Sequence, residues 1–229
     1  MSSTPDARPS TRVLIIDDHL LFAQSLELTL SLEGYDVRRL TLPDVGGSMS
    51  TLRSLALRAN ARIALLDLDL GRFGDGMSLI APLAQAGTNV VVVTASTDRG
   101  RWGACLHQGA RKVLSKVGPL QETLSTVRRL HLGLPVITNV ELETLLEAWR
   151  SHRMVTDDMR RRLDLLTTRE REILAFLVEG RNVRQIARTG VVSEATVRTQ
   201  VKSILAKLEV SSQLAAVSLA HHVSWQHSS

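Results

Sequence analysis

The stretch around Asp67 constrains the fold of this chain more than any other. An apolar run, Ala61-Arg-Ile-Ala-Leu-Leu, ends in this carboxylate, and a glycine-rich loop, Gly71-Arg-Phe-Gly-Asp-Gly76, follows it. A run without polar alternation predicts a strand that is buried on both faces of a parallel sheet. Chemistry in open α/β sheets collects just outside the carboxyl ends of the strands, where Asp67 would lie. The alternative is a carboxylate that only caps the next turn.

Apolar runs alternate with helical patterns from residue 11 to residue 132. This alternation predicts a doubly wound parallel sheet of five strands with right-handed crossovers, of the flavodoxin-like kind. The expected strands are 13–16, 35–40, 61–66, 89–94 and 111–115, and the expected helices are 20–33, 51–59, 77–86, 98–108 and 119–132.

Several polar side chains follow these strands and are expected to meet at one edge of the sheet. Asp17, Asp18 and Asp67 would repel one another unless they held a hard cation such as Mg²⁺ through their oxygen atoms. Thr94 and Lys116 supply a hydroxyl and an ammonium group, which suit an incoming phosphoryl group. The edge therefore favours metal-assisted phosphoryl chemistry over a simple cap.

With these motifs in order, residues 12–132 resemble the receiver domain of two-component response regulators. The resemblance implies Mg²⁺ as cofactor and a histidine kinase as partner. It also implies that Asp67 is the phosphoacceptor. Asp17 and Asp18 would be the acidic pair, with Asp18 the more direct metal ligand, and Asp69 would lend a backbone carbonyl to the metal. Thr94 would be the switch hydroxyl, and Lys116 would contact the phosphoryl group.

Three positions depart from the receiver pattern. Val113 stands where the family usually has an aromatic side chain whose inward swing reports phosphorylation. Gly71 stands where proline is common, and the loop to Gly76 is one residue longer than usual. A second hypothesis follows, in which the chain binds DNA as a constitutive dimer or under the control of another ligand, without a phosphate switch.

The region after residue 132 changes in character. We expect a helix over residues 139–150 and a charged, solvated linker over 151–164, with docking of Trp149 onto a domain as the alternative. The linker as a whole spans 133–164. Residues 1–10 and 225–229 are expected to be tails.

Residues 165–224 predict a small all-α domain. Thr167-Thr-Arg-Glu170 is a capping box, Asn182-Val-Arg-Gln185 repeats the device, and Ser193 caps a third helix. A fourth helix is expected over 212–223. Two capped helices joined by a tight turn are typical of helix-turn-helix geometry, and a plain helical bundle with a basic face is the alternative.

From Leu166-Thr-Thr-Arg-Glu-Arg-Glu-Ile-Leu174 onward, this domain closely resembles the LuxR-type DNA-binding domain. The resemblance implies homodimers that read two half-sites of promoter DNA. Side chains implied to face the major groove are Arg198, Thr199 and Lys202, and those implied to contact the DNA backbone are Thr196, Lys207 and Arg184.

Composition limits the remaining classes. No run of about 18 apolar residues exists that could span a membrane, and the first residues lack the apolar middle of a signal peptide. The single cysteine, Cys105, permits no internal disulfide and is expected to fill space on a helix. A net charge of +5 permits nucleic acid as a partner. These features fit a cytoplasmic protein.

We therefore predict a response regulator and transcription factor of the NarL/FixJ type, not an enzyme. A remote alternative is a haloacid-dehalogenase-like phosphatase, because Asp67-Leu-Asp69 resembles the nucleophile and acid pair of that family. Gly71 occupies a position where that family usually has threonine or valine, and a helix-turn-helix domain follows, so this reading is disfavoured.

Overall fold

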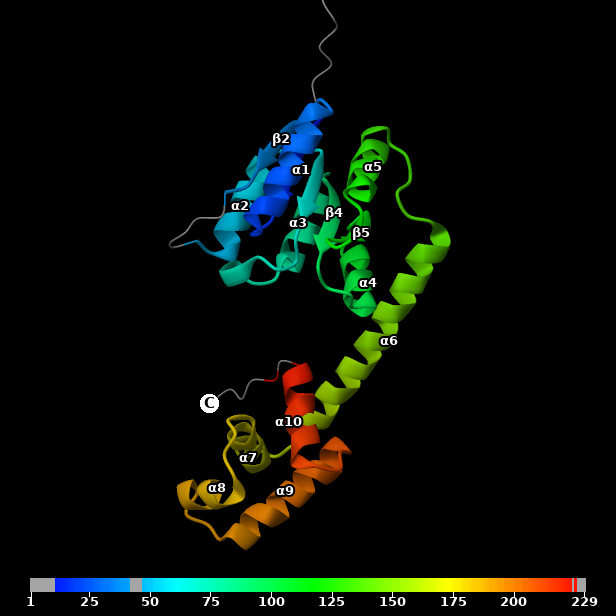
Figure 1. The fold of residues 1–229 in the computed structure, drawn as a ribbon. Coiled ribbons are helices and arrows are strands. Elements are labelled where there is room, and N and C mark those ends of the chain that lie inside the picture. Colours follow the sequence, from blue (N-terminus) through cyan, green and yellow to red (C-terminus); the bar gives the residue numbers. More distant parts are fainter. Residues whose placement is uncertain (1–10, 42–46, 224, 226–229) are drawn as a thin grey trace, which may run out of the picture. The chain divides into compact units, whose positions relative to one another are not determined.

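The computed structural model describes residues 11–41, 47–223 and 225. The chain divides into two compact units, Met1–Arg150 and Ser151–Ser229, and Figure 1 draws both. The predicted tail over 1–10 and residues 226–229 lie outside the described residues. Trp225, predicted to belong to the C-terminal tail, packs against the core of the second unit instead.

The first unit contains a parallel sheet with the strand order β2-β1-β3-β4-β5. Each pair of neighbouring strands is parallel, so every connection is a crossover through a helix. The predicted fold class is confirmed. The strands are β1 (Arg12–Ile16), β2 (Asp36–Arg39), β3 (Ile63–Leu66), β4 (Asn89–Thr94) and β5 (Lys112–Ser115).

Helices cover both faces of this sheet (Figure 1). Alternate residues of β1 enter different cores: Val13 and Ile15 pack with side chains of α1 and α5, whereas Leu14 and Ile16 pack with side chains of α2, α3 and α4. This alternation is the period of two expected of a strand. The helices are α1 (Leu20–Leu32), α2 (Met49–Arg58), α3 (Ile80–Gln85), α4 (Arg99–His107) and α5 (Leu120–His131).

The loop after β3 differs from a simple turn into one helix. Two 3₁₀ turns, η1 (Gly71–Phe73) and η2 (Gly76–Leu79), precede α3, so the helix predicted over 77–86 begins as a 3₁₀ turn. Gly71 and Gly74 have φ angles of +56° and +88°, in the region that favours glycine. These two glycines accommodate the extra residue that the sequence predicted for this loop.

The linker is the main correction to the sequence analysis. One helix, α6 (Asn139–Asp164), replaces the predicted helix over 139–150 and the predicted charged linker over 151–164. Its charges pair at helical spacing, as in the Arg153–Asp157 and Arg162–Asp158 ion pairs. Pairs three and four residues apart stabilise helices, which explains why this charged run is ordered. The first half of α6 belongs to the first unit and the second half to the second unit.

The second unit contains the helices α7 (Thr168–Val178), α8 (Val183–Thr189), α9 (Glu194–Leu208) and α10 (Gln213–His222). Both predicted capping boxes and the Ser193 cap are confirmed. An apolar stripe of α9 is buried in the core of this unit: Val197, Val201, Ile204 and Leu208. Among the described residues, no helix combines the length and the apolar character needed to cross a bilayer.

Candidate functional site

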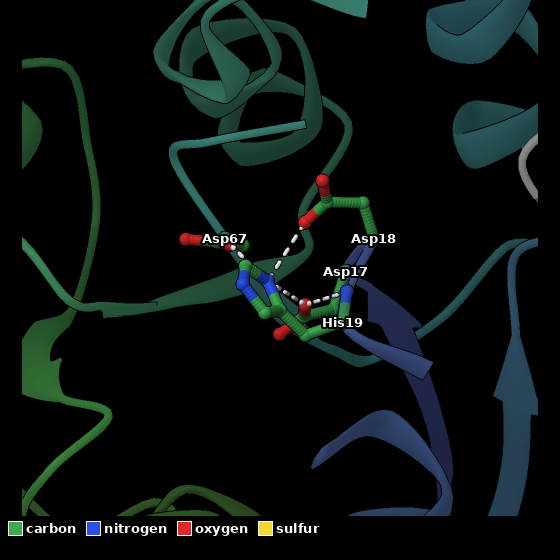
Figure 2. A group of neighbouring side chains, drawn as sticks. All are labelled: Asp17, Asp18, His19 and Asp67. Carbon is green, nitrogen blue, oxygen red and sulfur yellow. Dashed lines mark hydrogen bonds and ion pairs between the residues drawn. The ribbon is translucent and has the colours of Figure 1, made fainter. Parts of the chain in front are cut away.

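The predicted carboxylates meet at the carboxyl ends of β1 and β3. Asp17 and Asp67 are buried, with 7% and 3% of their surface exposed, whereas the side chain of Asp18 is 30% exposed. One ligand atom from each of Asp17, Asp18, Asp67 and His19 lies within 4.8 Å of the others, and Figure 2 shows the four side chains pointing toward one another. The sheet topology therefore brings together residues that are 50 positions apart in the sequence.

Lys116 joins this group from the end of β5. Its Nζ atom lies 2.6 Å from Asp67 Oδ2 and 2.8 Å from Asp17 Oδ1, and the side chain is only 9% exposed. The backbone N–H of Lys116 donates to the carbonyl of Thr94, so the pairing of β4 and β5 holds it in place. Lys116 thus partly neutralises two buried carboxylates that would otherwise repel each other.

His19 also belongs to the group, and the sequence analysis did not assign it a role. Its Nδ1 atom lies 2.8 Å from Asp18 Oδ1 and 3.2 Å from the Nζ atom of Lys116. Its backbone N–H donates to Asp17 Oδ1 at 2.8 Å, which holds that carboxylate in place (Figure 2). The available signal was its position directly after the acidic pair, at the end of a buried strand.

The pKa of Asp67 is raised above its ordinary value. Burial is the largest cause, and the negative charge of Asp17 acts in the same direction. The hydrogen bond and charge of Lys116 and the backbone N–H of Asp69 lower the pKa but do not cancel the effect of burial. The ionised form of Asp67 is therefore less well stabilised than an ordinary carboxylate, which leaves it disposed to bind a cation or to form a bond.

Thr94 and Val113 lie on the adjacent strands β4 and β5. Thr94 is 2% exposed, and its Oγ1 atom accepts a hydrogen bond from the backbone N–H of Ser96 in the loop before α4. Val113 is 3% exposed and belongs to the core between the sheet and α2, α3 and α4. The hydroxyl is therefore in the predicted place, whereas Val113 provides only an aliphatic filler.

The loop after Asp67 is packed closely against it. Asp69 accepts a hydrogen bond from the backbone N–H of Gly71 through Oδ1, and the N–H of Gly76 donates to the carbonyl of Leu68. A Cβ atom on Gly76 would collide with the carbonyl oxygen of Asp67. Gly76 is thus required by the close approach of two backbones.

The donor set fits a divalent cation. Three carboxylates with ligand atoms this close together supply the oxygen atoms that Mg²⁺ prefers. A cavity of about 560 Å³ opens beside Asp17, Asp18 and Gly71, on the side of the more exposed carboxylate. The cavity therefore gives solvent access to the side of the group formed by Asp17 and Asp18.

The second unit presents the predicted DNA-contacting side chains on α9. Arg198, Thr199 and Lys202 are all exposed: Arg198 flanks the buried stripe, and Thr199 and Lys202 lie on the side away from it. Arg198 forms an exposed pair with Glu194, with a distance of 3.4 Å between Nη2 and Oε2. Such a pair is weak and would exchange readily for a DNA group.

The residues predicted for the DNA backbone differ in their surroundings. Arg184 is exposed at the start of α8, and Thr196 lies in the first turn of α9, where its N–H is capped by Ser193. Lys207 is engaged within the protein: its Nζ atom lies 2.7 Å from Oε2 of Glu170. The side chain of Lys207 is still 33% exposed, at the edge of the unit.

Glu170 is a buried carboxylate of the second unit, and its environment is saturated with donors. It accepts hydrogen bonds from Lys207, from the hydroxyl of Ser203, and from the N–H and hydroxyl of Thr167. Burial alone would raise its pKa, but these donors outweigh it and lower the pKa to about 2. Ser203 on α9 thus turns toward Glu170, with its hydroxyl 2.7 Å from Oε1.

Comparison with known proteins follows the same division of the chain. Residues 13–128 match the family described as the response regulator receiver domain, and residues 164–220 match the bacterial regulatory proteins of the luxR family.

Similar proteins cover the chain almost completely. The nitrate/nitrite response regulator protein homolog of Haemophilus influenzae is 28% identical over 211 residues, which are 91% of this chain and 95% of that protein. The nitrate/nitrite response regulator NarP of Escherichia coli is 28% identical over 218 residues, which are 94% of this chain and 96% of that protein.

The fold is also similar to that of RcsB from Salmonella enterica serovar Typhimurium, solved bound to the promoter rprA with BeF₃⁻. For that structure the TM-score is 0.50 and the identity 21%, over 94% of this chain and 99% of the other. The chain belongs to the response regulators of the NarL type, in which a receiver domain is followed by a LuxR-type DNA-binding domain.

Proposed function

We propose that this response regulator controls transcription through phosphorylation of Asp67 by a histidine kinase in the cytoplasm. The observation that carries the proposal is the position of Lys116, whose Nζ atom lies between the buried carboxylates Asp17 and Asp67. A phosphoryl group on Asp67 would bring new negative charge to this ammonium group. Lys116 is therefore already in place to contact the product.

The transfer is an in-line displacement at phosphorus. One Oδ atom of Asp67 forms the new P–O bond while the P–N bond of the donor phosphohistidine breaks. The electron pair of that bond goes to the imidazole nitrogen, and the product is an acyl phosphate on Asp67. Positioning and charge stabilisation supply most of the catalysis in such reactions, which fits a site made of fixed charges.

Asp17, Asp18 and Asp67, together with the backbone carbonyl of Asp69, would hold Mg²⁺. When bound, the cation offsets charge on the phosphoryl oxygens. His19 and Lys116 then have separate roles: the backbone of His19 orients Asp17, and the ammonium group of Lys116 pairs with the phosphoryl group. Thr94 supplies a hydroxyl that can donate to the same group.

The output is sequence-specific binding to promoter DNA as a homodimer. Arg198, Thr199 and Lys202 would read base edges in the major groove, because all three extend from the exposed side of α9. Thr196 and Arg184 would contact phosphates, and Lys207 would do so from its ion pair with Glu170. Leu214, which is 78% exposed on α10, is a candidate contact for the dimer.

The experiment that tests this function compares the native protein with Asp67→Ala. We expect native protein with Mg²⁺ and acetyl phosphate to gain one phosphoryl group and to bind promoter DNA more tightly, and Asp67→Ala to show neither change. Mass spectrometry reads the modification, and fluorescence anisotropy reads the DNA affinity.

Val113 favours one alternative, in which DNA binding is independent of phosphate, because a valine cannot swing as an aromatic side chain does. In that case the native protein would become phosphorylated while its DNA affinity and its oligomeric state stayed unchanged. That outcome would exclude the switch and keep the DNA-binding function.

A further inference from the structure

A second cavity opens at the amino edge of the sheet, at the opposite end of the strands from Asp67. Its volume is about 540 Å³, which is within the range of sites for small molecules. Arg62 directly precedes β3, Asn89 is the first residue of β4, and Arg111 directly precedes β5, and all three line the cavity. Since β3, β4 and β5 are neighbours in the sheet, the two arginines flank Asn89. The proposed function uses none of these residues.

Hydrogen bonds hold the polar side chains of this cavity in place. Nε of Arg111 donates to Oδ1 of Asn89 at 3.1 Å, and Nδ2 of Asn89 donates to the carbonyl of Arg62 at 3.1 Å. The backbone N–H of Asn89 donates to the same carbonyl at 2.9 Å. In the part of the chain that the structure describes, the Arg111 side chain donates to the protein through Nε, and the N–H groups on its Nη atoms remain available to a ligand.

The two arginines differ from Arg12, which also lies at this edge of the sheet. Arg12 pairs with Asp36 at 2.7 Å, whereas no described carboxylate forms an ion pair with Arg62 or Arg111. Arg62 instead donates from Nη2 to the carbonyl of His131, at the end of α5 and at 3.5 Å. Good hydrogen bonds of this kind measure about 2.7 to 3.2 Å, so capping of α5 accounts poorly for Arg62. Two such cations beside one cavity favour an anionic ligand.

The rest of the cavity lining is mainly apolar and comes from α5 and from the segment that connects α5 with α6. Its apolar residues are Leu130, Leu134, Pro135, Val136 and Ile137. Two hydrogen bonds fix the segment: Nε of Arg129 donates to the carbonyl of Pro135, and the N–H of Leu134 donates to the carbonyl of Arg129, each at 2.8 Å. Leu134 is nevertheless 44% exposed. An apolar group that entered the cavity would therefore remove apolar surface from water.

We propose that this cavity binds a small amphiphilic anion, whose oxyanion head is held by Arg62 and Arg111 and whose apolar body lies against residues 130–137. Planar guanidinium groups match the oxygen atoms of a carboxylate or of a phosphate monoester. An inorganic anion would leave the apolar lining uncovered, so the ligand is organic. The site is independent of the proposed function, because Asp67 lies at the other edge of the sheet.

A set of five probes separates the head of the ligand from its body. Octanoate and octyl phosphate carry both parts, octanol lacks the charge, and acetate and inorganic phosphate lack the apolar body. Calorimetric titration of the full chain gives each affinity, and backbone amide NMR shifts of Arg62, Asn89 and Leu134 locate the bound probe. We expect octanoate or octyl phosphate to bind roughly tenfold or more tightly than the other three, with shifts at these residues. The tighter of the two identifies the head group as carboxylate or phosphate.

Variants of the lining test the roles of the side chains. Arg62→Gln and Arg111→Gln should each weaken binding of the tighter probe roughly tenfold, because a charge-assisted hydrogen bond is lost. Arg111→Lys should lie between Arg111→Gln and native protein, because lysine keeps the charge but not the planar fork. Leu134→Ser should weaken the same probe by removing apolar lining. Arg58→Gln is the matched control, because Arg58 is exposed in the last turn of α2 and does not line the cavity.

Several outcomes would overturn the proposal. Equal affinity for octanol and octanoate would show an apolar site in which the charge has no role. Equal affinity for acetate or inorganic phosphate would show an ion site without an apolar part. A loss in Arg58→Gln as large as that in Arg62→Gln would reveal a general effect of charge, and a lack of binding by both amphiphiles up to about 5 mM would remove the site. Each of these results leaves phosphorylation of Asp67 untouched, so the proposed function stands or falls separately.

Discussion

Each unit of the molecule contains a lysine paired with buried carboxylate groups, Lys116 with Asp67 and Asp17 in the first and Lys207 with Glu170 in the second, and the pKa values of Asp67 and Glu170 shift in opposite directions. The pKa of Asp67 is raised, since burial and the nearby Asp17 outweigh the contribution of Lys116. The pKa of Glu170 is lowered to about 2, since Lys207, Ser203 and Thr167 all donate to it. A carboxylate whose pKa is raised by burial is less stabilised as an anion, whereas one saturated with donors is suited to holding helices together.

The largest expected effect separates these roles. Asp67→Ala should abolish phosphorylation by acetyl phosphate completely while the second unit keeps its stability. Glu170→Ala should leave the rate of phosphorylation unchanged. Phosphate incorporation measured by mass spectrometry on the two variants decides the comparison, and loss of phosphorylation in Glu170→Ala would contradict it.

The unfolding free energy of the second unit should be lowered by Glu170→Ala and not by Asp67→Ala. Glu170→Ala leaves Lys207, Ser203 and the N-terminus of α7 without their shared acceptor, and should cost the second unit about 3 kcal/mol of unfolding free energy. Hydrogen exchange of α7 and α9 under denaturant reports this unit separately. A cost below about 1 kcal/mol would mean that Glu170 is not the structural carboxylate described above.

The pH dependence of the second unit should follow from the same group. A lowered pKa stabilises the folded state above the unfolded pKa of 4.5, and this contribution is lost as pH falls toward about 2. We expect about 3 kcal/mol of stability to disappear in this window. In Glu170→Gln, the unfolding free energy of the second unit should depend less on pH between 4.5 and about 2. If this pH dependence is the same as in native protein, other carboxylates cause it.

Two lysines of α9 should differ in their effects on DNA affinity and on stability. Lys202→Ala should weaken promoter binding roughly tenfold, because an exposed cation facing the groove is lost, and should leave stability unchanged. Lys207→Met should lower stability and reduce DNA affinity less than Lys202→Ala does, because Lys207 is shared with Glu170. Anisotropy titrations at several salt concentrations measure the DNA affinity of both variants. Equal losses of affinity would contradict the prediction and show that Lys207 contacts DNA as strongly as Lys202 does.

The smallest expected effect lies in the turn between α8 and α9. Val191 has a φ angle of +50°, a strained conformation for a β-branched residue, and it is 91% exposed. Val191→Asn should stabilise the second unit by about 0.5 to 1 kcal/mol, because asparagine tolerates this conformation. Denaturant midpoints test it, with Val192→Asn as the neighbouring control that should bring no gain.

The helical caps and strand ends were predictable because their signals are local. The box of Thr167 and Glu170 could be read from four consecutive residues, and Asp67 from the apolar run before it. The partnership of Glu170 with Lys207 could not, because those residues are 37 positions apart and meet only when α7 packs on α9. The contact of His19 with Lys116 could not be read either, since it spans 97 positions, although the place of His19 directly after the acidic pair was a local signal.

By itself, the sequence determined the order of strands and helices along the chain and the face of α9 that remains exposed, because periodicity carries that information. It also determined which edge of the sheet holds Asp17, Asp18 and Asp67, because each of them follows a strand. Only the tertiary structure decided that the charged run after Arg150 continues as a helix, and that Gly103 lies against the backbone of α6. The Gly103 contact depends on packing between residues far apart in the sequence, for which a linear pattern holds no signal. The charged run carries its ion pairs at helical spacing, but these became evident only once the helix was seen. The same packing decided which buried carboxylate is saturated with donors and which, Asp67, remains disposed to react.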